Sequence, residues 1–213
     1  MMTARLRLFG IQMSYLWKVL WHPLDGLYDI VYKGKGGIVS ACVIYLLFYI
    51  AIILKTALTN FIFNPYGLHA TSLSTIFITF VLPVLVLVVA NCLVSSITQG
   101  QGTYRSVFIS TAYMLAPYII FAVPVSIFSN IFSGAEEAVY LFTIWFVKIW
   151  TGFFLFLGIM EVHAYSIPEA IVNTLWILFA GVMVILFSLA FFGITYQSVN
   201  FLYEFIREAI GYV

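Results

Sequence analysis

Residues 172–194 read VNTLWILFAGVMVILFSLAFFGI and contain no Asp, Glu, Lys or Arg. A helix needs about 20 apolar residues to cross a hydrocarbon core of about 30 Å, because each residue rises about 1.5 Å. This stretch is therefore long and apolar enough to cross a membrane as one helix. Four more stretches of this kind precede it, near residues 38–56, 74–98, 107–132 and 139–160.

The apolar stretches predict helices rather than membrane strands. A strand of a membrane barrel shows about 10 residues of alternating polarity, whereas these stretches are continuously apolar. The predicted fold class is an all-α integral membrane protein with five transmembrane helices. Pro83, Pro117 and Pro124 fall in the two longest stretches, 74–98 and 107–132, and predict kinks there.

The composition of the whole chain agrees with this class. Of 213 residues, 64% are hydrophobic and 8% are charged, against about 25% charged in soluble domains. The formal net charge of +1 provides no field for capturing nucleic acid. Cys42 and Cys92 both lie in apolar stretches, so they predict packing residues and no disulfide framework.

Basic residues next to the apolar stretches predict the orientation, because Lys and Arg are retained on the cytoplasmic side. Glu136 and Glu137 lie in a predicted external connection that has no basic residue. We therefore expect a cytoplasmic N-terminus and an external C-terminus. The basic residues that lead to this expectation are Arg5, Arg7, Lys18, Lys33, Lys35 and Arg105.

Three parts are expected along the chain: a cytoplasmic basic amphipathic arm at 1–37, a five-span membrane domain at 38–194 and an external amphipathic helix at 195–213. In the arm, a helix in the headgroup plane should stop at His22, because Pro23 disfavours helical geometry in the residue before it. In the last part, apolar residues repeat at spacings of three and four, and this helix could continue the fifth span. A partner protein could occupy its apolar stripe, which consists of Val199, Leu202, Ile206 and Ile210.

Two acids follow Pro23 in the arm. Asp25 and Asp29 fit the first turn of a short helix, where the helix dipole favours negative charge. The alternatives are a catalytic or cation site, or pairing with Lys33 and Lys35 at the surface.

Three short motifs together resemble a known family. One is the glycine turn GQGTYR at 100–105, the second is a Tyr-x-x-x-Pro step in the third stretch, and the third is HPLDG at 22–26. The pattern is similar to the Yip family of Ypt/Rab-interacting membrane proteins, and more closely to its bacterial branch. The site residues that carry the resemblance are Gly100, Gly102, Tyr104, Arg105, Tyr113, Pro117, His22, Pro23 and Asp25.

The resemblance implies five spans in a bacterial cytoplasmic membrane, a cytoplasmic N-terminus, no catalysis and action through association with other membrane proteins. Eukaryotic members of the family are tied to Rab GTPases and vesicle traffic. Bacterial relatives are often encoded near carbohydrate importers of the ATP-binding-cassette (ABC) type. An accessory role beside the permease subunits of such an importer is therefore what the resemblance suggests.

Lys148 lies near the middle of the fourth stretch, where a charge costs about 2.5–3.5 kcal/mol on insertion scales. It should therefore face protein or water. One interpretation is a structural lysine that reaches toward the interface; the other is a site for a substrate, ion or partner.

No motif for catalysis or nucleotide binding is present, so we expect no enzyme, no catalytic residue and no cofactor. Glu161, His163 and Glu169 cluster after the fourth stretch. They are interpreted as a polar loop at the membrane edge, with metal binding as the less favoured alternative because no further ligand motif completes a set.

The sequence thus predicts a non-catalytic accessory subunit of a larger membrane assembly, with membrane lipids and other integral membrane proteins as partners and no nucleic acid. A solute transporter is the first alternative, with Lys148, Asn91 and the kinked third span lining a path. A membrane-shaping or trafficking factor is the second.

Overall fold

The structure is a computed structural model that describes the backbone of residues 2–68 and 71–211, and the side chains of 7–68, 71–208 and 210–211. The side chain of Arg5 and the last two residues of the predicted terminal helix, 212–213, lie outside this description. Within the described ranges the elements are all helical. Five helical segments are long and apolar enough to cross a membrane, which confirms the predicted all-α fold with five such helices: Ile38–Leu58, Leu73–Ile97, Tyr104–Ile131, Gly134–His163 and Ile167–Glu208.

The order of elements follows the five apolar stretches, with two helices in front of them. Short turns of 3-10 helix, Ser129–Ile131 and Gly134–Glu136, join the third segment to the fourth. The longer elements are α1 (Met2–Trp21), α2 (Pro23–Val31), α3 (Ile38–Leu58), α4 (Leu73–Ile76), the π-helical η1 (Phe77–Val81), α5 (Leu82–Ile97), α6 (Tyr104–Met114), α7 (Ala116–Phe128), α8 (Glu137–His163) and α9 (Ile167–Gly211).

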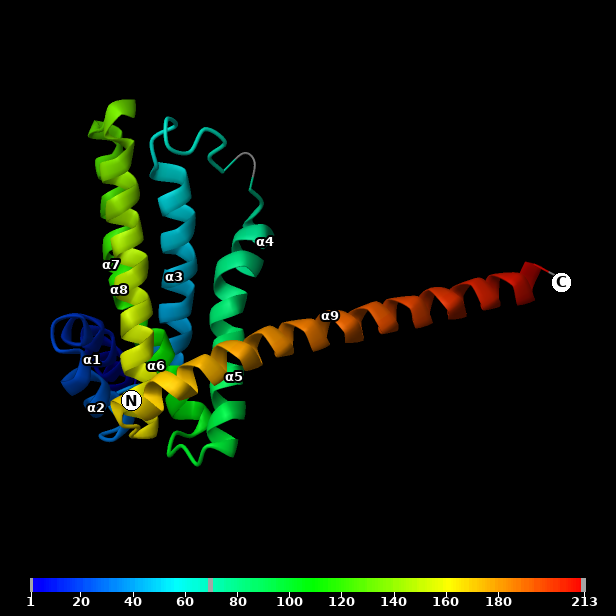
Figure 1. Cartoon of the computed structure of the whole chain (residues 1–213), viewed down its shortest axis with the longest axis horizontal. Helices are drawn as coiled ribbons and strands as arrows, with labels where there is room; N and C mark the ends of the chain where they lie inside the picture. The colour runs from blue at the N-terminus through cyan, green and yellow to red at the C-terminus, as the bar shows by residue number, and fades with distance from the viewer. Residues whose placement is uncertain (1, 69–70, 212–213) are drawn as a thin grey trace.

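Figure 1 shows α3, α5, α7 and α8 running lengthwise in one bundle, with α1 and α2 beside one of its ends. We call this end, which also holds the connection 98–103, the arm end, and the opposite end, with residues 59–68 and 132–136, the loop end. Helix α9 starts at the arm end, packs against α5 and then runs away from the bundle. The fifth apolar segment is therefore not aligned with the other four.

The core of the bundle is built around the third segment, α6 and α7. Tyr113, Met114 and Leu115 are among its fully buried side chains. In this segment 67% of the span is buried, compared with 6% in the fifth. Helix α8 approaches α6 closely at Gly158, where an added Cβ would lie 2.8 Å from Cγ of Met114. The third segment is therefore the one that the other helices surround.

Two of the three prolines coincide with a change of helix geometry. Pro83 follows the π-helical stretch η1, and Pro117 lies in the first turn of α7, two residues after the helix breaks at Leu115. A proline cannot donate to the preceding turn, which explains why the hydrogen-bond pattern changes before each of them. Pro124 lies inside the uninterrupted helix α7, so it does not divide the segment as the other two do.

Helices α1 and α2 form a hairpin at the arm end. Helix α1 ends at Trp21 and α2 begins with Pro23, which confirms the predicted stop at His22. Gly26 permits the two helices to touch, since an added Cβ there would lie 2.7 Å from Cγ2 of Val19. This hairpin places the basic residues of the arm beside the bundle.

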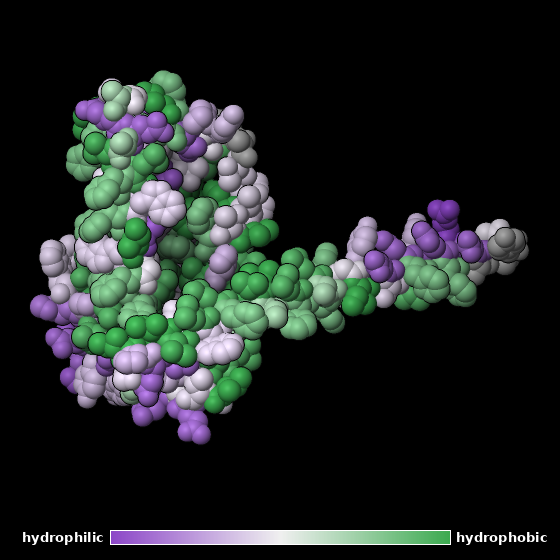
Figure 2. Space-filling model, viewed as in Figure 1, coloured by the Kyte–Doolittle hydropathy of each residue, from purple (hydrophilic) through white to green (hydrophobic). Residues whose placement is uncertain are grey.

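Helix α9 is one continuous helix across residue 195, so the predicted terminal helix continues the fifth span, which is one of the arrangements that the sequence allowed. Ala170, Asn173 and Ile177 are buried, and beyond Ile177 no described residue of α9 is. Figure 2 shows the projecting part of α9 as hydrophobic next to the bundle, with hydrophilic residues gathered along one edge farther out. The bundle therefore holds α9 by about its first four turns, up to Gly181, where an added Cβ would lie 3.8 Å from Cβ of Ala90 and from Cγ1 of Val86.

Candidate functional site

The glycine turn packs directly against the last turn of α8 at the arm end. An added Cβ at Gly100 would lie 2.5 Å from Nδ1 of His163 and 2.5 Å from the hydroxyl oxygen of Tyr165. At Gly102 an added Cβ would lie 2.7 Å from Cε1 of the same histidine. These three distances are too short for a Cβ atom, so the close approach of this turn to His163 requires glycine at positions 100 and 102.

His163 is buried and uses both ring nitrogens. The backbone N–H of Gly102 donates to Nδ1 at 3.1 Å, and Nε2 lies 3.0 Å from Oδ1 of Asn91. Because Nδ1 accepts, we assign the proton to Nε2, which donates to the Asn91 carbonyl oxygen. His163 and Asn91 are each only 2% exposed. The three residues therefore join α5, the turn and α8 through a neutral histidine.

The connection from α8 to α9 is short and tightly held. Ala164 has a left-handed backbone with φ of 54°, a common way to end a helix, although glycine is the usual residue there. Tyr165 stacks on the His163 ring at a centroid distance of 5.1 Å, and its hydroxyl lies 2.8 Å from the Thr98 hydroxyl. Gln99, with φ of 57°, is also left-handed. Two strained residues, Gln99 and Ala164, thus lie beside the start of α9.

A polar cavity of about 610 Å³ lies between these elements and the first turns of α9. The turn contributes amide side chains, the corner contributes ring and hydroxyl groups, and α9 contributes a carboxylate and an amide. Such a mixture of donors and acceptors can hold a polar group by hydrogen bonds. The lining residues are Thr98, Gln99, Gln101, His163, Ala164, Tyr165, Pro168, Glu169, Val172 and Asn173.

The expectation of a polar loop that contains Glu161, His163 and Glu169 is wrong, because all three residues lie in helices. Glu161 and His163 belong to the last turn of α8, and Glu169 belongs to the first turn of α9, where it accepts a hydrogen bond from the N–H of Ser166 at 2.8 Å. The left-handed residue at Ala164 lets the chain turn sharply within three residues, so both helices extend into the expected loop.

Of the predicted site residues, Asn91, Gly100 and Gly102 meet at this place. Tyr104 and Arg105 follow in the first turn of α6 but are exposed and face away from the His163 cluster, toward a separate groove beside Cys42. Sequence reasoning missed the central role of His163, which only the pairing of the turn with α8 reveals.

Tyr113 and Pro117 lie deeper in the third segment. The Tyr113 hydroxyl donates to the backbone carbonyl of Gln12 in α1 at 3.1 Å, and the Ser40 hydroxyl donates to the Gln12 side chain at 2.8 Å. These bonds tie the arm to α6 and to the start of α3. Gln12 had no signal in the sequence, because its partners are distant along the chain.

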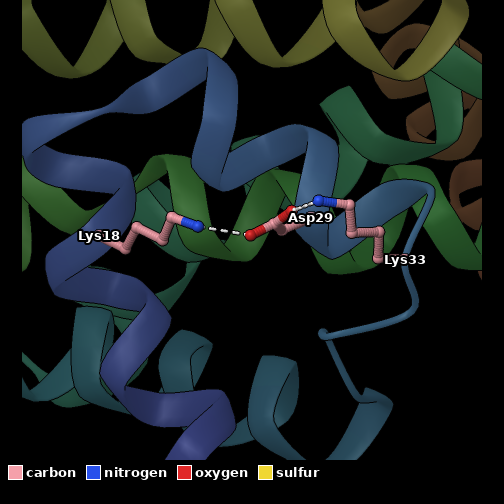
Figure 3. Close-up of polar contacts among 3 residues, drawn as sticks. All are labelled: Lys18, Asp29 and Lys33. Carbon is pink, nitrogen blue, oxygen red and sulfur yellow. Dashed lines mark hydrogen bonds and ion pairs between the residues drawn. The ribbon is translucent and has the colours of Figure 1, made fainter.

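The arm carries a second polar cluster, drawn in Figure 3. The carboxylate of Asp29 pairs with Lys18 of α1 and, at 2.7 Å, with Lys33. Hydrogen bonds from Lys18 and then Lys33 lower the pKa of Asp29 from its usual 3.8 to about 2. His22 and Asp25 line the same shallow groove.

The expectation for the two arm acids is correct for Asp25 and wrong for Asp29. Asp25 lies in the first turn of α2, after Pro23, whereas Asp29 lies near the end of that helix. The ion pair with Lys18, contributed by the preceding helix, explains why an acid is accommodated there. Of the two lysines expected to pair with the acids, Lys33 does so.

Lys148 lies apart from both clusters. It is half-buried on α8, and its ammonium lies 4.4 Å from the centre of the Trp145 ring. Fifteen residues separate it from His163 on the same helix, which corresponds to about 22 Å along the axis. Lys148 and Asn91 therefore do not share one site.

At the arm end, His163 has a structural role as the residue that joins the turn to α5. Both nitrogens of His163 are engaged in hydrogen bonds, which leaves neither free to accept a proton or a metal. Among the residues that the structure describes, no group of three or more His, Cys, Asp or Glu side chains could hold a metal ion.

No protein-family model matches the chain, and no curated protein or solved structure is significantly similar to it. The likeness to the Yip family therefore remains a hypothesis based on the three motifs.

Proposed function

We propose that this chain is a non-catalytic integral membrane protein that acts as an accessory subunit by binding other integral membrane proteins. Five helices of sufficient length and apolar character support the membrane location. The positive-inside rule supports a cytoplasmic arm.

The observation that carries the proposal is the course of α9. It has 45 residues, and its described part beyond Ile177 has no buried residue and extends from the bundle. An apolar helix of this length is stable only where lipid or protein covers it. A helix that leaves its own bundle presents all its faces to other chains, whereas the third segment presents few.

The arm-end cluster supports the same role by fixing the root of α9. The turn at Gly102 holds His163, the corner at Ala164 follows at once, and the polar cavity separates the turn from Glu169 and Asn173. This region sets the direction in which α9 leaves the bundle. We expect the glycine turn and the arm to make a second contact with the partner, on the cytoplasmic side. The Yip resemblance favours permease subunits of an ABC importer as that partner.

Photo-crosslinking in native membranes tests the proposal. A photoreactive phenylalanine analogue at Phe187, which is 73% exposed on α9, should form adducts with another membrane protein. The matched control is Phe142 on α8, which is also 73% exposed. Adducts from Phe187 that are absent or much weaker from Phe142 are expected. Only lipid adducts at both positions would contradict the proposal.

Transport remains the second candidate, and the polar cavity at the arm end is the observation that favours it. The path through Lys148 and Asn91 is not supported as one site, because the two residues lie at different levels of the bundle. A flux assay in liposomes that contain only this protein separates the two functions: an accessory subunit gives no flux, and a transporter gives flux that a bulky residue at Asn173 reduces.

A further inference from the structure

The polar cavity at the arm end has a buried amide in its wall that lacks a partner. Asn173 of α9 lines this cavity and is 6% exposed. In the part of the chain that the structure describes, its side chain makes no hydrogen bond, whereas the similarly buried Asn91 bonds to His163. Buried amides are in most cases hydrogen-bonded. The cavity is therefore expected to hold a polar group that satisfies Asn173.

Two further groups on the cavity wall are acceptors. The Thr98 hydroxyl donates to the Val94 carbonyl at 3.1 Å, so the Tyr165 hydroxyl, 2.8 Å from that of Thr98, donates to it. The Tyr165 oxygen keeps lone pairs that can accept a hydrogen bond. One carboxylate oxygen of Glu169 accepts from the N–H of Ser166, and the other has no partner among the described residues. These two side chains therefore add two acceptors to the amide oxygen of the buried asparagine.

The charge of the cavity wall favours a cationic ligand. Glu169 carries a negative charge there, His163 is neutral, and none of the described lining residues is Lys or Arg. An anion would be repelled by this carboxylate, whereas a cation would be attracted. A carboxylate, a phenol and an amide oxygen together match the N–H donors of a protonated primary amine. A metal ion is less suited, because the described residues include no group of three His, Cys, Asp or Glu that could hold one.

We propose that this cavity binds a small hydroxylated primary amine, with its ammonium at Asn173, Tyr165 and Glu169. The volume of about 610 Å³ is typical of sites for small organic molecules and larger than an ammonium group alone requires. The exposed amides of Gln99 and Gln101 line the side of the cavity formed by the turn and can bond to hydroxyl groups of the ligand. The ligand would thus join the turn to the root of α9. This inference goes beyond the accessory role and does not depend on it.

Saturation-transfer NMR on the full chain, purified in a mild detergent, tests this site with a matched pair of compounds. The probe is tris(hydroxymethyl)aminomethane at neutral pH, which carries a protonated amine and hydroxyl groups on one carbon. Its match is pentaerythritol, in which a further hydroxymethyl group replaces the ammonium. The amine should bind roughly tenfold more tightly, because hydrogen bonds between charged groups are the stronger ones. Equal binding of the two compounds, or binding of neither, overturns the inference.

Variants locate the binding in the cavity. Glu169→Gln and Asn173→Leu should each weaken binding of the amine roughly tenfold, because each removes an acceptor for the ammonium. The first keeps an oxygen that can accept from Ser166 and the second keeps a similar volume, so both should fold, as circular dichroism checks. Glu161→Gln removes a carboxylate at the same end of the molecule but outside the cavity wall, and should match the wild type. Unchanged binding in both cavity variants, or an equal loss in Glu161→Gln, overturns the inference.

Competition identifies other occupants. Tetramethylammonium carries the charge without N–H donors, and potassium is a bare cation. Displacement of the amine by either one at the same concentration overturns the inference, because the site would then recognise charge alone. The accessory role fails in a different experiment: an absence of protein adducts from Phe187 would contradict that role and leave amine binding unchanged.

Discussion

The third apolar segment and the fifth illustrate opposite uses of a helix that could cross a membrane. The fifth has the higher mean hydropathy and is almost entirely exposed, whereas the third is less hydrophobic and is the most buried. The buried residues of the third segment include Ser110, Thr111 and Ser126. Lipid tails are as apolar as leucine, so helices in a bilayer associate through close packing and hydrogen bonds. Between these two segments, the higher hydropathy therefore belongs to the exposed helix and not to the buried one.

The largest difference in stability between the two segments is expected at a matched pair of glycines. Gly158→Leu overpacks the contact between α8 and α6 at Met114 and should destabilise the protein by about 2–3 kcal/mol. Gly193→Leu on α9 has no described atom within 4 Å of the added Cβ and should leave stability unchanged. Thermal unfolding in detergent measures both. A loss of equal size at Gly193 would show that α9 is packed within the same chain.

Removing volume should have a somewhat smaller effect. Met114→Ala leaves a cavity at a fully buried position, and we expect a loss of about 1–2 kcal/mol in the free energy of unfolding. In a soluble protein the cost has two parts, the cavity and the lost transfer of the side chain from water. In lipid only the cavity contributes, because the side chain is in an apolar medium in either state. Leu186→Ala, at a position 54% exposed on α9, should change stability by less than about 0.5 kcal/mol. Equal losses, measured by chemical unfolding in mixed micelles, would contradict the ranking of the two regions.

The hydrogen bond from Tyr113 to Gln12 offers a third comparison between the buried segment and α9. Tyr113→Phe removes the donor to the Gln12 carbonyl and should cost about 1 kcal/mol, with faster hydrogen exchange in α1. Tyr196→Phe, at an exposed tyrosine of α9, is the control and should change neither quantity. Unchanged exchange in α1 after Tyr113→Phe would mean that other contacts suffice to hold the arm.

The smallest effect concerns acid conditions and the arm. Because the pKa of Asp29 is lowered to about 2, its pairing stabilises the arm above pH 4 and is lost as the pH falls from about 4 to about 2. Hydrogen exchange in α1 and α2 should therefore increase over this range, relative to residues 182–194, which contain no titratable group. In Asp29→Asn the arm should already exchange faster at pH 6, with a smaller change on acidification. An identical pH response in this variant would assign the effect to another group.

The residues of the candidate site differ in how far the sequence could identify them. Gly100 and Gly102 stand out in the motif, and their need for glycine follows once His163 is seen beside them. Asn91 is a polar residue in an apolar stretch, which is a usable signal by itself. The hydrogen bonds to His163 and Gln12 join residues 61 and 101 positions apart, and no local pattern predicts such pairs.

The sequence alone determined that the chain is helical and has five segments able to cross a membrane, because length and continuous apolar character decide this locally. It also determined that Pro83 and Pro117 lie where the helix geometry changes and that the arm turns at His22. Only the tertiary structure decided that the third segment is central, that α9 leaves the bundle and that the glycine turn lies against His163. Such features depend on which surfaces meet, and many pairings of apolar helices are nearly equal in hydropathy, so close packing and a few hydrogen bonds select among them.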